Sequence, residues 1–172
     1  MIKNAIKIII SFTVFVLLQV WVLNHIHLFK VVVPMLYIYV IVKFPIQMSR
    51  SQNIRIAFLL GLTIDMFSNT LGMHAAACSL IGFMRPPVMK LFVEKERLEE
   101  ATPSYYTFGT GAFMRYVTAL VILHHLVLYL VESVSLFDPV FLLIRIFASV
   151  ILTTLCIFAL EAFNVSRKNG TA

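Results

Sequence analysis

The chain has 172 residues, of which 60% are hydrophobic and 13% are charged, and its formal net charge is +6. A soluble domain is usually about 25% charged, so this chain has too few charged residues to cover itself with a water-facing surface. The composition therefore argues against disorder and nucleic-acid binding, and it predicts an integral membrane protein. At about 20 residues for each span, this length leaves no room for a separate soluble catalytic domain.

Apolar runs predict six transmembrane helices in one bundle that occupies residues 1–172. The first run follows Lys3 and Lys7 in the manner of a signal peptide. No small-residue cleavage site follows that run, so we expect an uncleaved helix. The expected spans cover residues 5–24, 28–44, 54–68, 73–92, 108–131 and 140–163. The fold class predicted is thus an all-α polytopic membrane protein.

Prolines and polar residues interrupt this pattern. The second expected span is the shortest, and Pro34 lies near its start. Polar residues over 68–72 predict a tight turn between the third and fourth spans. Arg85-Pro86-Pro87 interrupts the fourth span, where we expect a kink with Arg85 reaching lipid phosphates; a gating element is the alternative. The charge-dense segment 94–104 is either a solvated loop or a contact for a cytoplasmic partner.

The basic residues predict the orientation, because Lys and Arg gather on the cytoplasmic side of membrane proteins. With six spans, both termini lie on one side. One face of the bundle receives Lys3, Lys7, Lys43, Arg50, Arg55, Arg85, Lys90, Lys95, Arg97, Arg115, Arg167 and Lys168. The other face receives Lys30, and Arg145 falls inside the sixth span. We therefore expect both termini in the cytoplasm.

Polar residues within the spans are the candidate functional residues, because they are costly in lipid. Asp65 is either a carboxylate that fixes a partner helix or a ligand, or a helix-end residue satisfied by water and the following turn. Arg145 either pairs with Asp65, with Glu132 or Asp138 as other possible partners, or extends to the outer interface. His124 is expected to bond a neighbouring helix.

The amides Gln19 and Asn24 are expected to form hydrogen bonds between helices in the outer half of the first span. The two cysteines, Cys78 and Cys156, are expected to be buried apolar residues. No spacing typical of a metal site, a nucleophilic triad or a phosphate-binding loop is present in the sequence. The sequence therefore predicts neither a metal site nor a cofactor, and a protein that is not an enzyme.

The segment GLTIDMFSNTLGMHA, residues 61–75, resembles the signature of the rod shape-determining protein D (MreD) family. Gly61, Asp65, Gly72 and Ala75 stand at the matching positions. The segments VLNHIHLF, residues 22–29, and LYIYVIVKFP, residues 36–45, also look like members of that family, and length and expected topology agree along the whole chain.

The resemblance implies a non-catalytic scaffold of the bacterial elongation machinery in the inner membrane, which influences cell shape and peptidoglycan synthesis. It implies contact with MreC, a bitopic protein, and with the MreB filament system. Through these it implies a connection to a SEDS glycosyltransferase and a penicillin-binding transpeptidase. It also implies a fold similar to substrate-binding subunits of energy-coupling-factor transporters. No catalytic residues are known for the family, so only Gly61, Asp65 and Gly72 carry over.

From this resemblance we expect an MreC-like helix to dock where Gly61 and Gly72 permit close approach and Asp65 and Asn24 fix its register. The alternative function is a vitamin-binding subunit of an energy-coupling-factor transporter, which requires an outward-facing polar pocket. A third hypothesis is an ion or proton pathway through Asp65, Arg145 and His124.

Overall fold

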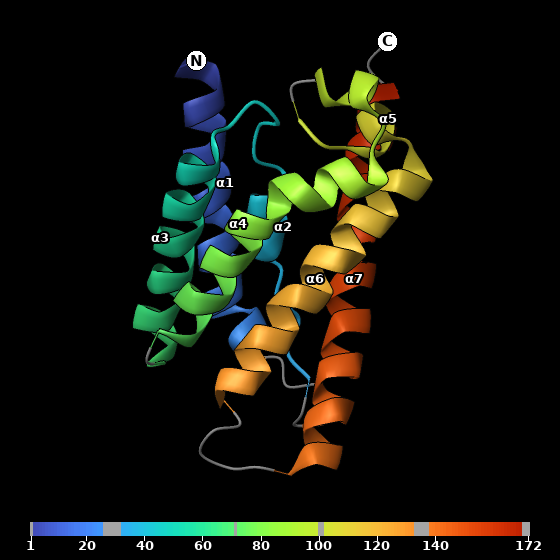
Figure 1. Cartoon of the computed structure of the whole chain (residues 1–172). Coiled ribbons are helices and arrows are strands. Elements are labelled where there is room, and N and C mark those ends of the chain that lie inside the picture. The colour runs from blue at the N-terminus through green and yellow to red at the C-terminus, as the bar shows by residue number, and fades with distance from the viewer. Residues whose placement is uncertain (1, 26–31, 71, 100–101, 133–137, 170–172) are drawn as a thin grey trace.

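The computed structural model describes residues 2–25, 32–70, 72–99, 102–132 and 138–169, and it is helical throughout its regular elements (Figure 1). The elements in chain order are α1 (Ile2–Trp21), η1 (Leu23–His25), α2 (Ile38–Val42), α3 (Arg50–Ser68), α4 (Met73–Phe92), η2 (Lys95–Glu99), α5 (Tyr105–Phe108), α6 (Thr110–Glu132) and α7 (Pro139–Asn169). The all-α prediction is confirmed for these residues.

Two helices are long and apolar enough to cross a membrane, namely α6 and the part of α7 from Pro139 to Asn164. A shorter apolar stretch covers Ile6–Trp21 of α1. The helices α3 and α4 carry charged residues within their length, including Asp65 and Arg85, which lowers their mean hydropathy.

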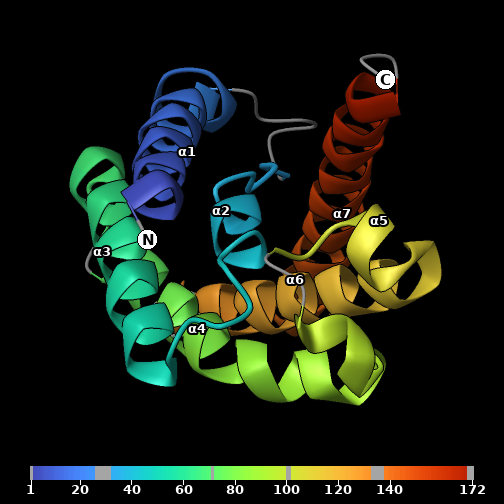
Figure 2. The same ribbon diagram turned by 90° about the horizontal axis from the view of Figure 1, so that it is seen from above.

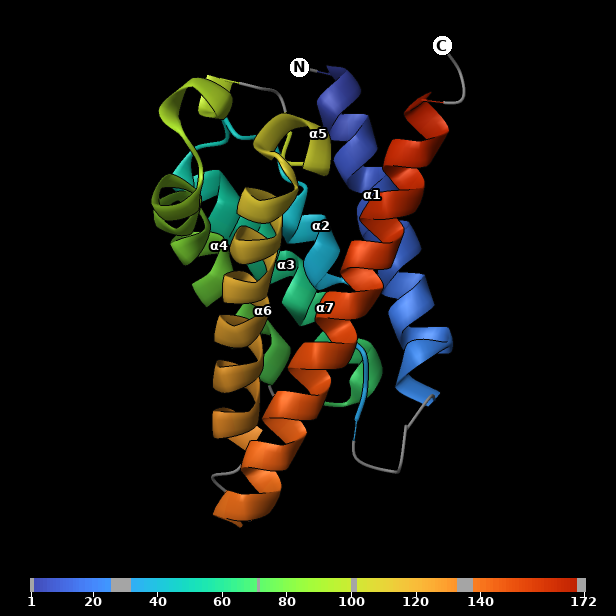
Figure 3. The ribbon, with the colours of Figure 1, turned by 90° about the vertical axis from the view of Figure 1, so that its right-hand side faces the viewer.

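Successive segments of the chain alternate in direction, so the start of α1 and the end of α7 lie at the same end of the molecule (Figures 1 and 3). We call this the terminal end. At the opposite end, which we call the far end, α3 turns into α4 and α6 is connected to α7. This arrangement brings segments distant in sequence together at the far end.

The second expected span, 28–44, is not one continuous helix. Residues 28–31 lie outside the described part of the chain, residues 32–36 are not helical, and α2 has only five residues. Proline has no N–H group and disfavours a helical residue before it, which is consistent with an extended chain around Pro34. Figure 2 shows α2 in the centre of the molecule, between α1 and α7 and above α4 and α6.

Side chains from two other helices satisfy the backbone of this irregular segment. The Gln19 amide donates to the Pro34 carbonyl and accepts from the Leu36 N–H, each over 3.0 Å. The Met35 N–H donates to Thr153 Oγ1 over 3.1 Å. A buried N–H or C=O without a partner is costly, so Gln19 of α1 and Thr153 of α7 make this central segment possible.

The core of the bundle is mainly apolar, but it also encloses several polar side chains, and many large apolar side chains are exposed on the outside. The buried polar residues are Gln19, Asn53, Asp65, His74, Arg85, His124, His125, Ser149, Thr153, Thr154 and Glu161. The exposed apolar residues include Ile9, Val14, Phe58, Leu59, Met66, Leu130, Ile144, Phe147, Ile151 and Leu155. Soluble proteins keep contiguous apolar patches small, so this surface suits an apolar surrounding.

Arg85 does not reach the surface, contrary to the expectation that it contacts lipid phosphates. Its side chain is fully buried, and α4 continues through Pro86 and Pro87. The guanidinium donates to the carbonyls of Phe44 and Pro45, to Asn53 Oδ1 and to the Tyr116 hydroxyl. These carbonyls follow the end of α2, where a helix carries partial negative charge and lacks donors. That environment favours the cation in the interior.

Candidate functional site

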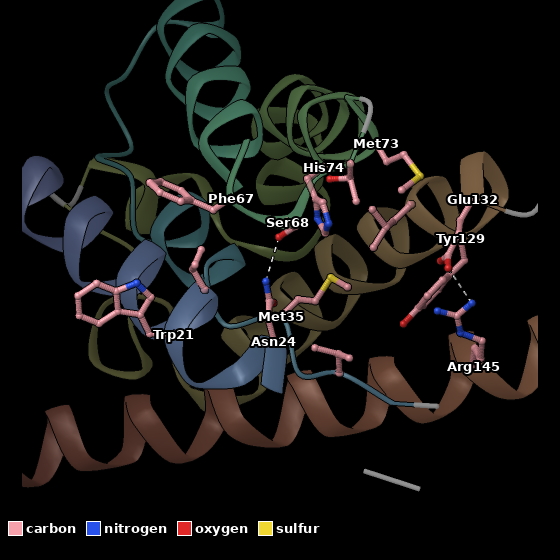
Figure 4. Close-up of a pocket in the computed structure, with 14 residues that line it drawn as sticks. Trp21, Asn24, Met35, Phe67, Ser68, Met73, His74, Tyr129, Glu132 and Arg145 are labelled. Atoms are coloured by element: carbon pink, nitrogen blue, oxygen red, sulfur yellow. Dashed lines mark hydrogen bonds and ion pairs between the residues drawn. The ribbon is translucent and has the colours of Figure 1, made fainter. Parts of the chain in front are cut away.

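A cavity of about 480 Å³ lies at the far end, among the ends of α1, α3 and α6 and the starts of α4 and α7 (Figure 4). Its polar lining consists of Asn24, Ser68, Thr70, His74, Tyr129, Glu132 and Arg145. Its apolar lining consists of Val20, Trp21, Val33, Met35, Phe67, Met73 and Leu128. The hollow is open to the outside, and only its volume falls in the range of small-molecule sites.

Asp65 borders this region, and its carboxylate caps α4. It accepts from the backbone N–H groups of His74 (3.1 Å) and Ala75 (2.8 Å) and from the Thr70 hydroxyl. The N-cap residue of α4 is Gly72, which has no side chain to perform this role. Asp65 therefore fixes a partner helix, as one of the two hypotheses states, but that helix belongs to the same chain.

Gly61 permits a close approach between α3 and α4. A Cβ atom at this position would lie 2.4 Å from the His74 carbonyl oxygen and 2.6 Å from the Ala75 Cα atom. Gly72 has a φ of 76°, a conformation that side chains disfavour. Since α4 occupies the space beside Gly61, the expected docking of an external helix at Gly61 and Asp65 would require α4 to move away.

The amides at the end of α1 bind within the chain, as expected. Asn24 Nδ2 donates to Ser68 Oγ of α3 over 2.9 Å, and Gln19 Nε2 donates to Asn24 Oδ1 over 3.0 Å. These contacts join α1 to α3 at the rim of the cavity.

Arg145 pairs with Glu132 rather than with Asp65. Its Nη1 atom lies 2.9 Å from Glu132 Oε1, and its guanidinium lies 4.6 Å from the centre of the Tyr129 ring. Asp65 is already engaged by the N-terminus of α4, so it has little capacity left for a cation. The Asp65–Arg145 pair is therefore not formed, and one of the two other expected partners, Glu132, holds Arg145.

His124 lies in a buried hydrogen-bonded group, and its partner is Tyr37, which precedes α2, rather than a residue of a neighbouring helix. The Tyr37 hydroxyl lies 2.7 Å from His74 Nδ1 and 2.9 Å from His124 Nε2. The neighbouring His125 ring contacts the Val121 carbonyl through Nδ1 (2.9 Å) and Thr153 Oγ1 through Nε2 (3.4 Å). His124 and His125 are adjacent in sequence, yet both rings are buried.

The hydrogen-bond pattern indicates the tautomers of His74 and His124. Among the described residues, the buried His124 Nδ1 atom has no hydrogen-bond partner. Because a buried unpaired N–H is rarer than an unpaired acceptor, we assign the His124 proton to Nε2, which then donates to Tyr37. The Tyr37 hydroxyl proton then has two acceptors within reach, His74 Nδ1 at 2.7 Å and Met35 Sδ at 3.4 Å, and the shorter contact favours His74. A neutral His74 must then carry its proton on Nε2.

A second polar cluster, which the sequence reasoning missed, lies toward the terminal end. Glu161 of α7 is buried and lies 3.1 Å from Lys43 Nζ, while the Tyr39 hydroxyl donates to Glu161 over 2.6 Å. Lys43 also donates to the Pro103 carbonyl. An acidic residue inside an apolar helix is an available signal, and applied to Glu161 it would have found this pair.

The described residues contain no cluster of three or more His, Cys, Asp and Glu suited to a metal ion. Cys78 is buried and Cys156 is half-buried, and both are free thiols. Of the five histidines in the sequence, His27 and the side chain of His25 lie outside the described part of the chain.

Within the segment 94–104, residues 100 and 101 and the side chain of residue 99 lie outside the described part of the chain. Arg97 Nε lies 3.2 Å from Glu94 Oε2, an i,i+3 pair of the kind expected there. The side chains of Glu94, Lys95 and Glu96 are exposed, so this segment presents a charged surface at the terminal end.

No known family model, curated protein or solved structure matches this chain. The functional proposal therefore depends on the sequence motif and on the geometry described above.

Proposed function

We propose that the chain is a non-catalytic membrane scaffold of the machinery that elongates rod-shaped bacterial cells, similar to MreD proteins. The observation that carries the proposal is the joint between α3 and α4. Three of the four positions that carry the resemblance, Gly61, Asp65 and Gly72, act together there as the close contact, the cap and the turn. These residues all serve one structural feature, the joint between α3 and α4. We would expect this of a family signature more than of a chance similarity.

The proposal places the protein in the bacterial inner membrane, with six crossings and both termini in the cytoplasm. It is supported by the apolar outer surface and by the alternating direction of the segments. It is also supported by the distribution of charge, because Lys7, Arg50, Lys90 and Arg115 lie on elements or turns near the terminal end.

The partner in this proposal is the single transmembrane helix of an MreC-like protein. The outward face of α7 is the docking face that we favour, because Phe147, Ile151 and Leu155 are each about 60% exposed and follow a helical repeat. The MreB filament system would meet the charged terminal end. The SEDS glycosyltransferase and the penicillin-binding transpeptidase would be reached through the partner or directly.

Co-purification with a co-expressed MreC-like protein tests the scaffold. Replacing Phe147, Ile151 and Leu155 together with alanine should reduce the recovered partner several-fold, because the exposed side chains that would pack on its helix are removed. A matched triple replacement on α3, at Phe58, Leu59 and Leu62, should leave recovery unchanged. Failure of the unaltered chain to retain the partner, or to restore rod shape to cells lacking their own scaffold, would contradict the proposal.

A solute-binding subunit of an energy-coupling-factor type transporter is the second candidate function. The cavity at the far end favours it, since such a subunit needs a polar pocket that faces outward. This candidate requires an ATPase partner. A vitamin that remains bound through purification, together with co-purification of an ATPase, would favour transport over the scaffold.

A further inference from the structure

We propose that the outward face of α4 near the terminal end binds an anionic phospholipid whose head group carries hydroxyl groups. This face, which we call the α4 face, consists of Arg50 of α3 and of Phe83, Pro87, Lys90 and Leu91 of α4. The inference rests on the proposed membrane location of the chain but not on the proposed partner. Figure 2 shows α4 along an outer edge of the molecule, with α2 and α6 on its inner side.

The α4 residues of this face share one stripe of the helix. Phe83, Pro87, Lys90 and Leu91 follow one another at the spacing of a single helical face. All four are exposed, and Leu91 is 73% exposed. The other side of α4 packs against α3 and α6. The acyl chains of a lipid can therefore lie against Phe83 and Leu91.

Two cations lie at the ends of this stripe. The Arg50 guanidinium carbon lies 4.7 Å from the centre of the Phe83 ring, and such stacking holds a cation beside an apolar surface. Lys90 lies about 10 Å farther along the helix than Phe83. Among the described residues, no ion pair or side-chain hydrogen bond involves the Arg50 guanidinium or the Lys90 ammonium group. Both cations can therefore bind a phosphate.

The sequence around these cations contains no compensating acid. The segments 50–64 and 73–93 have neither Asp nor Glu. Glu94 follows Lys90 at a spacing that would pair the two on a helix, but α4 ends before Glu94, which instead binds Arg97 over 3.2 Å. The charge of the α4 face therefore complements an anionic head group at the membrane surface.

The Phe83 carbonyl adds a hydrogen-bond acceptor to this face. In a helix this carbonyl accepts from the N–H of residue 87 or, in a tighter turn, of residue 86. Both residues are proline, which has no N–H group. A carbonyl without a donor is costly where lipid replaces water, so a hydroxyl group that donates to it is favourable. A glycerol phosphate head group combines hydroxyl donors with a negative charge.

An acidic segment of a protein is the other occupant that matches this charge. The exposed Phe83 and Leu91 favour a lipid, because its acyl chains continue from the head group along the apolar outside of the bundle. A short acidic peptide has no comparable apolar part. The experiment therefore asks first whether lipid type matters at this face.

Tryptophan quenching by brominated lipids measures which lipid lies beside the α4 face. The variant Trp21→Phe with Leu91→Trp has a single tryptophan, and it lies at this face. It is reconstituted in phosphatidylcholine mixed with phosphatidylglycerol or with phosphatidylmethanol, which has the same charge but no hydroxyl group. In each sample one lipid carries bromine in its chains near the head group. We expect phosphatidylglycerol to bind at least about fivefold more tightly than phosphatidylcholine, with phosphatidylmethanol between them.

The unaltered chain supplies the matched control position. Trp21 is its only tryptophan, and it is 72% exposed at the far end of the molecule. Quenching at Trp21 should show no preference for phosphatidylglycerol, because the two cations of the α4 face lie toward the terminal end.

Charge variants in the Leu91→Trp background test the two cations. Arg50→Gln with Lys90→Gln should weaken phosphatidylglycerol binding by about fivefold for each charge removed. Lys7→Gln with Arg55→Gln removes the same two residue types from exposed positions elsewhere. Arg55 lies on a different side of α3 from Arg50, because five residues turn a helix by more than one turn. This control should keep the preference.

Pro87→Ala tests the hydroxyl contact, because alanine restores the N–H group that the Phe83 carbonyl lacks. This variant should reduce the preference for phosphatidylglycerol over phosphatidylmethanol and should leave the preference of both over phosphatidylcholine unchanged. Thermal unfolding of each variant shows whether it remains folded.

Equal quenching by phosphatidylglycerol and phosphatidylcholine at position 91 would overturn the inference, and so would an unchanged preference after loss of both cations. Equal binding of phosphatidylglycerol and phosphatidylmethanol would overturn the hydroxyl contact. Because lipid binding is measured without a partner protein, failure here leaves co-purification with the MreC-like protein unaffected, and the two proposals fail separately.

Discussion

Asp65 and Arg85 are two charged side chains within helices of this bundle, and each is stabilised by the end of another helix. Asp65 accepts from N–H groups at the start of α4. Arg85 donates to carbonyl groups just after the end of α2. In both cases the charge is opposite in sign to the partial charge of the helix terminus, which offsets the cost of removing the ion from water.

Replacement of Asp65 tests this role. Asp65→Ala should lower the free energy of unfolding by about 2 to 4 kcal/mol, because a helix cap is lost and buried donors are left without an acceptor. Asp138 caps α7 through the Val140 and Phe141 N–H groups, but it is exposed. Asp138→Ala should therefore cost about 1 kcal/mol or less. Chemical unfolding in detergent measures both, and equal losses would contradict a special role for Asp65.

At the scale of elements, α3 and α4 form the closest pair of helices around the motif. Gly61 lies against the backbone at His74 and Ala75, and Gly82 of α4 lies against Asn53 and Ala57 of α3. Small residues let two helices approach closely enough for their backbones to pack, which is a common basis of helix association in membranes. Glycines on both helices thus permit the close packing of α3 against α4, and Asp65 caps the start of α4.

Alanine substitution at Gly61 should destabilise the hairpin even though alanine favours helices over glycine. The new Cβ atom would meet backbone atoms at 2.4 to 2.6 Å, so we expect a loss of about 1 to 3 kcal/mol. Gly111, near the start of α6, has open space around the same atom. Gly111→Ala should therefore be neutral or gain up to about 1 kcal/mol. Thermal unfolding of the two variants should move in opposite directions, and equal shifts would argue against close packing at Gly61.

At the scale of the whole molecule, the bundle has an apolar core that also encloses several polar side chains, and large apolar side chains are exposed on its outside. The central segment before α2 has a backbone that is satisfied by Gln19 and Thr153 instead of by helical bonds. Buried backbone N–H and C=O groups are costly without partners. The arrangement therefore requires α1 and α7 to enclose this segment, and both helices carry the polar side chains that it needs.

Cysteine labelling tests the proposed orientation of the whole molecule. In a background that carries Cys78→Ala and Cys156→Ala, Asp138→Cys should react with an impermeant maleimide in intact spheroplasts. Glu96→Cys should react only after the membrane is permeabilised. The two sites lie at the far end and the terminal end respectively, and both are exposed. Labelling of both sites from outside, or the reverse pattern, would contradict cytoplasmic termini.

The sequence by itself determined the helical class and the positions of most helices, because long apolar runs permit few other structures in lipid. It also singled out Asp65, Asn24, Arg145 and His124, since polar side chains in such runs need partners. These inferences depend only on the local sequence, that is, on apolar runs and on the polar residues within them.

Only the tertiary structure decided which partners those side chains have. Arg145 binds Glu132 and not Asp65, and Arg85 turns inward because the end of α2 offers carbonyl groups there. The same applies to the broken second span, whose backbone depends on Gln19 and Thr153 from distant parts of the chain. Hydropathy measures the transfer of a segment into lipid, and it contains no information about acceptors and donors that distant helices bring to the same place.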